Sequence, residues 1–170
     1  MLILPLTIVV AFHALAQSPL AAAPEESVWK MQQARGCTGI KLDVEGTKAV
    51  SNPYEGQVTA ALDQLTPDGG PGFLILTNRD GDYAQVAGGN GAFTAEWRQY
   101  ADNAFRHWVA GRAADKPGGQ VAIATNGFQI TVNSNEKLIS AEAKSILLAF
   151  CRAQERPPQF SWRDITERFQ

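Results

Sequence analysis

The sequence has few of the residues that build metal centres and covalent active sites. Its 170 residues include only 2 histidines and 2 cysteines, and His13 lies in the apolar N-terminal stretch, which leaves His107. A structural zinc site needs four protein ligands, and no Cys or His lies at ligand spacing from His107. We therefore expect no metal and no cofactor. We interpret His107 as a histidine on the surface of a sheet, the alternative being a general base or metal ligand.

The chain also lacks a surplus of either charge. It carries 15 basic and 17 acidic side chains, for a formal net charge of −2, and they are spread along the sequence. A protein that tracks a phosphate backbone shows a basic patch or stripe instead. Nucleic acid is therefore not an expected partner.

Residues 1–23 contain no Asp, Glu, Lys or Arg and begin with the apolar run Met1–Phe12. This outline is typical of a secretory signal peptide, with Ala14–Ala16 as the preferred cleavage motif. Two alternatives remain open, a true start at Met31 and a retained membrane anchor. The sequence thus favours an exported protein, periplasmic or secreted, and a cytoplasmic one if translation starts at Met31.

Residues 24–36 are predicted to be a linker, and residues 37–170 a single domain, because 45% hydrophobic content can fill one core. Cys37 and Cys151 are the disulfide candidates in that domain. In an exported protein they could close a long loop, whereas in the cytoplasm they would stay reduced. A buried, inert thiol is the alternative for Cys151, on the apolar side of a predicted helix.

Hydrophobic periodicity predicts two helices in this domain. The order Asn52-Pro53 is typical of an N-cap followed by the first helical residue, and the helix is expected over 53–65. A second helix is expected from Ser140, which we interpret as its N-cap. It would end before Pro157.

Alternating or continuous apolar runs predict the strands. They cover residues 40–45, 72–77, 82–87, 92–98, 103–109, 120–124 and 128–132, followed by an extended or short helical segment over 160–165. A helix is the alternative for 103–109; the strand, which places Phe105, His107 and Val109 on one face, is favoured because the segment is rich in aromatic residues. The order indicates an α+β fold, an antiparallel β-meander sheet with two helices packed on one face. Trp162 and Ile165 of the segment over 160–165 are expected to dock on the domain.

The hairpin predicted over 82–98 carries the candidate binding site. On a strand, Glu96 and Arg98 share one face, and Tyr83 and Gln85 would lie opposite them on the paired strand. Tyr and Arg are favoured at binding hot spots, so these four residues form a hypothetical partner-binding patch. The alternative is an ordinary solvated cross-strand pair.

The same hairpin carries a family resemblance. Tyr83-x-Gln85-x-x-Gly88-Gly89, followed by Phe93-x-x-Glu96-Trp97-Arg98, resembles the central pattern of small, mostly uncharacterised bacterial proteins loosely associated with immunity proteins of polymorphic toxin systems. With the closing segment Trp162–Thr166, the resemblance covers roughly residues 40–170. It implies a non-enzymatic protein whose partner is a cognate toxin.

The sequence thus favours a non-catalytic protein-binding domain, toxin-neutralising in its most specific form. The alternative is an exported envelope-associated or small-molecule-binding module. A hydrolase that depends on Glu96 is the third hypothesis, with no catalytic constellation visible for it. Exposed sheet edges could also support a homodimer.

Overall fold

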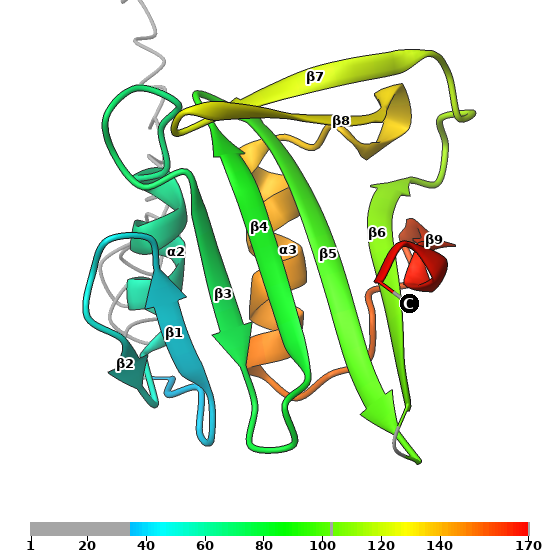
Figure 1. The fold of residues 1–170 in the computed structure, drawn as a ribbon. Coiled ribbons are helices and arrows are strands. Elements are labelled where there is room, and N and C mark those ends of the chain that lie inside the picture. Colours follow the sequence, from blue (N-terminus) through cyan, green and yellow to red (C-terminus); the bar gives the residue numbers. More distant parts are fainter. Residues whose placement is uncertain (1–34, 103, 170) are drawn as a thin grey trace, which may run out of the picture.

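The computed structural model describes residues 35–102 and 104–169. The leader predicted for 1–23, most of the 24–36 linker and Met31 lie outside the described residues. A seven-stranded antiparallel sheet has the strand order β2-β1-β3-β4-β5-β6-β9, and the two α-helices of the described residues pack on one face of it (Figure 1). The predicted α+β class, with a meander and two helices on one face, is confirmed.

The bounds of the elements follow the predicted ones closely. The sheet consists of β1 (Lys41–Val44), β2 (Val50–Ser51), β3 (Phe73–Thr77), β4 (Tyr83–Gly89), β5 (Ala92–Ala101), β6 (Ala104–Arg112) and β9 (Phe160–Asp164). The helices are α2 (Glu55–Asp63) and α3 (Ser140–Cys151), with short 3-10 helices η1 (Ser134–Glu136) and η2 (Thr166–Phe169). None of the helices in the described ranges is long and apolar enough to cross a bilayer.

The hairpin of β7 (Gln120–Thr125) and β8 (Phe128–Asn133) is a separate two-stranded sheet. It lies across one end of the main sheet, where β7 contacts β4 and β5 (Figure 1). The segment over 160–165, predicted to be extended or a short helix, forms the edge strand β9, which pairs with β6. The predicted docking is seen in Ile165, which is buried, and in Trp162, which is half-buried.

The core lies between the helices and the sheet. Alternate residues of each strand point to the helix side, because successive side chains of a strand face opposite ways. On β3 these are Leu74 and Leu76, and on α3 Ile146 and Leu147 meet them, all fully buried. Trp97 of β5 joins the same core.

Both helices begin differently from the prediction. Asn52 has a left-handed φ of 50°, and its side-chain Oδ1 accepts a hydrogen bond from the Gly39 backbone N–H at 2.7 Å. The N-cap of α2 is Tyr54, whose backbone N–H donates to Gln57 Oε1 at 2.8 Å. Ser140 is likewise the first helical residue of α3 and not its cap. The predicted caps were wrong because the side chain of the third helical residue can itself accept a hydrogen bond from the backbone N–H of the residue before the helix.

The turn between β4 and β5 is the predicted one. Asn90 and Gly91 have φ values of 50° and 80°, the pair that a tight hairpin turn needs. Gly88 belongs to β4, with a φ of 133°, and a Cβ there would collide with the carbonyl oxygen of Ala92. The glycine run therefore serves the close approach of two strands.

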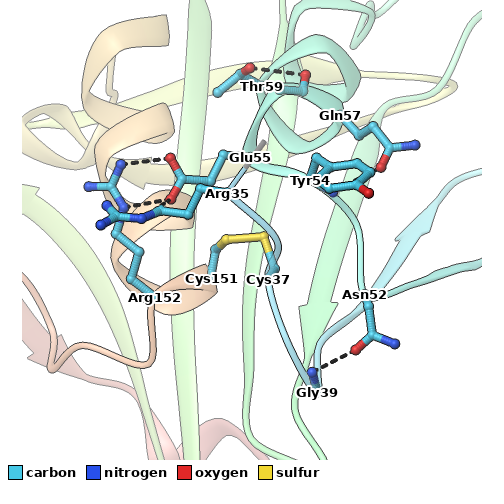
Figure 2. Close-up of a disulfide and its surroundings, with 11 residues drawn as sticks. Arg35, Cys37, Gly39, Asn52, Tyr54, Glu55, Gln57, Thr59, Cys151 and Arg152 are labelled. Carbon is cyan, nitrogen blue, oxygen red and sulfur yellow. Dashed lines mark hydrogen bonds and ion pairs between the residues drawn. A yellow bond between two sulfur atoms is a disulfide. The ribbon is translucent and has the colours of Figure 1, made fainter. Parts of the chain in front are cut away.

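Cys37 and Cys151 form a disulfide, with their Cα atoms 4.8 Å apart (Figure 2). The bridge joins the segment before β1 to the last residue of α3, and both residues are buried. Beside it, Arg152 donates two hydrogen bonds of 2.8 Å to the buried carboxylate of Glu55 (Figure 2). Arg35, from the predicted linker, approaches the same carboxylate at 3.9 Å. The disulfide and the ion pair thus fasten the two helices and the N-terminal strand together.

Acid is expected to weaken the fold through Glu142. The hydrogen bond from Arg112, with Nε–Oε1 at 2.8 Å, holds the pKa of this carboxyl below its ordinary value of 4.5. A carboxyl whose pKa is lower in the folded state stabilises the fold above the unfolded-state pKa, and this contribution is lost as pH falls through the folded-state pKa. The urea midpoint should therefore fall between pH 5 and pH 3, and it should fall less in Glu142→Gln. Equal losses in the two proteins would contradict the assignment.

Candidate functional site

The pairing of β4 with β5 brings the four predicted patch residues together. Tyr83 pairs with Arg98, and Gln85 pairs with Glu96, on the sheet face opposite the helices. The Arg98 guanidinium carbon lies 5.0 Å from the centre of the Tyr83 ring. Gln85 Nε2 lies 3.4 Å from Glu96 Oε2, a long hydrogen bond. The hairpin register therefore builds the predicted patch as one surface.

His107 completes this surface, and its predicted exposure was wrong. It pairs with Arg98 from β6, and its side chain is fully buried. The ring of Phe169 stacks on the imidazole with centroids 4.4 Å apart and an angle of 10°, and the Tyr83 ring meets it edge-on at 5.7 Å. The period of two predicted correctly on which face of the sheet His107 lies. No local sequence signal indicated that the C-terminal segment would cover that face.

The hydrogen bonds of His107 determine its tautomer. Arg98 Nη2 lies 2.8 Å from Nδ1, and Glu96 Oε2 lies 2.9 Å from Nε2. A guanidinium only donates, so Nδ1 must accept, and the ring proton of the neutral imidazole sits on Nε2 and is donated to Glu96. Both ring nitrogens of His107 are therefore used inside the protein, and neither is left to take a proton from a substrate.

Three aromatic rings lie close to the Arg98 guanidinium. Its central carbon lies 4.2 Å from the centre of the Phe105 ring and 4.7 Å from that of Phe169, in addition to Tyr83. Such contacts attract the cation to the ring faces and hold the side chain in place. We call this group of residues the Arg98 cluster; its members are Tyr83, Gln85, Glu96, Arg98, Phe105, His107 and Phe169.

Parts of the Arg98 cluster and its rim are open to solvent. Phe169 is 47% exposed, and Tyr100, next to Phe105, is 46% exposed. A hollow of about 380 Å³ adjoins the cluster at the end of β5 and β6, with Tyr100, Phe105 and Asp82 in its lining. The inner part of the Arg98 cluster is therefore buried and hydrogen-bonded, and its aromatic rim is accessible to solvent.

Of the cluster residues absent from the predicted patch, Phe105 had a usable signal. In a strand it shares a face with His107, and pairing with β5 then places both beside Arg98. Phe169 had none, because η2 folds back over β6 only through tertiary contacts such as the 2.9 Å bond from the His107 backbone N–H to Thr166 Oγ1.

The described residues contain no group of three or more His, Cys, Asp or Glu side chains that could hold a metal ion.

Replacing His107 tests whether its hydrogen bonds hold the cluster. His107→Leu would leave Glu96 and Arg98 without their shared partner, at an expected cost of about 1–3 kcal/mol in the free energy of unfolding. His107→Gln should lose less, because an amide can both donate to Glu96 and accept from Arg98. Urea unfolding at pH 7 measures both. A larger loss in the glutamine variant than in the leucine variant would contradict the hydrogen-bond assignment.

Comparison of the chain with protein-family models, with curated proteins and with solved structures finds no match in any of the three. The motif resemblance to immunity proteins therefore stays a prediction.

Proposed function

We propose that the protein is a non-catalytic protein-binding domain that engages a protein partner through the Arg98 cluster. The observation that carries this proposal is the position of Arg98 among Tyr83, Phe105 and Phe169 on an accessible sheet face. Interface hot spots are enriched in Arg and Tyr that are held in place before the partner arrives. Arg98, which is held on a strand and lies between aromatic rings, has that property.

The hydrogen bonds of the cluster support binding over catalysis. A general base must reach the proton that it removes, directly or through one water. The ring of Phe169 covers His107, and both of its ring nitrogens are hydrogen-bonded, one to Arg98 and one to Glu96. Glu96 in turn accepts from His107 and Gln85 through the same oxygen. The hydrolase hypothesis is therefore the least supported of the three.

The most specific form of the proposal is a toxin-neutralising, immunity-type protein. It rests on the motif resemblance of the hairpin around Glu96-Trp97-Arg98. A genomic neighbour that encodes a toxin, and inhibition of that toxin by the purified protein at equimolar concentration, would test it. A neighbouring toxin whose activity is unchanged by excess protein would reject this form and leave the general one standing.

The second candidate function is the exported envelope-associated or small-molecule-binding module. The Cys37–Cys151 disulfide favours it, because structural disulfides belong mostly to oxidising compartments. The 380 Å³ hollow beside Tyr100 offers a place for a small ligand. Intact mass of the native protein decides the premise: a chain that starts near Gln17 supports export, whereas one that starts at Met31 removes it.

Arg98→Gln is expected to weaken partner binding about 30-fold, the effect of losing a hot-spot contact of about 2 kcal/mol. The partner is first captured from the native host by crosslinking at physiological salt, and its affinity is then measured with purified components. Lys116→Gln is the matched control, since this exposed residue lies in the loop between β6 and β7, outside the Arg98 cluster and the hollow. Equal affinities of the Arg98 and Lys116 variants, or failure to capture any partner, would overturn the proposal.

A further inference from the structure

Four arginines of the described residues use the same edge of the guanidinium, but one of them has a different partner. In three, Nε and Nη2 donate side by side to a glutamate carboxylate at 2.6–3.0 Å. These pairs are Arg112 with Glu142, Arg152 with Glu55, and Arg163 with Glu136. In Arg98 the same two nitrogens lie 3.2 and 2.8 Å from a single acceptor, His107 Nδ1. Arg98 thus takes a neutral imidazole nitrogen where the others take a carboxylate.

Among the described residues, this choice leaves part of Arg98 without a protein partner. A guanidinium has five N–H donors, two on the edge that faces His107 and about three on the remaining edge. Within residues 35–102 and 104–169, Arg98 forms no salt bridge, and its hydrogen bonds all go to His107. The outer Nη1–Nη2 edge is therefore available to an external acceptor, and the side chain is only partly buried.

The surroundings of that edge restrict which acceptor fits. Phe105, Phe169 and Tyr83 lie around the guanidinium and reduce its contact with water, which strengthens a charge-assisted hydrogen bond. A carboxylate is planar and matches two parallel N–H donors. A nucleic-acid backbone would need a wider basic field, which a chain of net charge −2 with interspersed charges does not supply.

We infer that the outer edge of Arg98 binds the carboxylate of an aspartate or glutamate side chain of a protein partner. The inference rests on the proposed function and names the chemistry of the contact. His107 and Glu96 then act as positioning residues: the imidazole holds the guanidinium by its inner edge, and Glu96 holds the imidazole. An acidic residue of the partner, placed next to an apolar group that meets Phe169 or Tyr100, is the expected epitope.

The experiment titrates the full-length protein with N-acetyl-glutamate N-methylamide and follows the Arg98 Nε–Hε resonance by nuclear magnetic resonance. The resonance is assigned by its loss in Arg98→Lys. A saturable shift with a dissociation constant of about 1–100 mM is expected for one such contact. The glutamine counterpart of the probe, which has no carboxylate, should bind at least tenfold more weakly. No saturable shift at Arg98 with the glutamate probe would overturn the inference.

Two further measurements separate the alternatives. Inorganic phosphate is titrated in the same way, and binding as tight as that of the glutamate probe would overturn the choice of a carboxylate. Phe169→Ala, which removes an exposed ring and leaves Arg98 in place, should weaken glutamate binding several-fold; an unchanged affinity would contradict the role of the aromatic surroundings. A captured partner whose binding needs Arg98, in a protein that shows no response to the glutamate probe, would overturn the carboxylate while leaving the proposed function intact.

Discussion

Replacing both cysteines, Cys37→Ser with Cys151→Ser, is expected to lower the free energy of unfolding by about 5 kcal/mol. The two residues are 114 positions apart, so the bridge removes the closure entropy of a very long loop from the unfolded chain. Both cysteines are also buried, and two serine hydroxyls would have to be buried in their place. Single domains have about 5–15 kcal/mol in total, so the variant should be close to unfolding at 37 °C.

Urea unfolding at pH 7 measures this loss, with the oxidised wild type as the reference. The wild type reduced with a thiol should lose most of the same stability, although it buries no serine hydroxyls, which shows that the bridge and not the substitution is mainly responsible. Cys37→Ala with Cys151→Ala is the second control, since it avoids the buried hydroxyls and should recover part of the loss. A reduced wild type within 1 kcal/mol of the oxidised protein would show that the rest of the fold already fixes the two segments.

The sheet was predictable where local chemistry sets the register. The turn at Asn90 and Gly91 fixes the pairing of β4 with β5, and the period of two then decides which side chains share a face. Tyr83 and Arg98 therefore lie together as the sequence indicated. The same reasoning needs no knowledge of the rest of the chain.

The remainder of the Arg98 cluster depends on contacts between distant segments. His107 is buried because Phe169, 62 positions later, stacks on its ring, and no periodic pattern reaches across that separation. The edge pairing of β9 with β6 has the same origin. The caps of the helices failed for a different reason, since Asn52 was a good candidate locally and its side chain found the Gly39 N–H instead.

Arg163→Met is expected to lower the free energy of unfolding by about 3–5 kcal/mol at pH 7. Arg163 donates to both oxygens of Glu136, at 2.6 and 2.8 Å, and the Glu136 side chain is only 2% exposed. Without the guanidinium this carboxylate would be buried and would keep only its bonds from Asn133. Arg106→Met is the matched control: that side chain is 74% exposed and 3.8 Å from Asp164, so a loss below about 0.5 kcal/mol is expected.

The pH dependence of the Arg163→Met loss separates charge from packing. Burial raises the pKa of Glu136, but the hydrogen bonds from Arg163 and Asn133 outweigh it and hold the pKa below 4.5. Removing Arg163 shifts the folded-state pKa upwards. A folded-state pKa above that of the unfolded chain favours the protonated, folded protein as pH falls, so the loss caused by the substitution should shrink from pH 7 towards pH 4. A loss of the same size at both pH values would mean that Arg163 acts through the packing of its aliphatic stem and not through its charge.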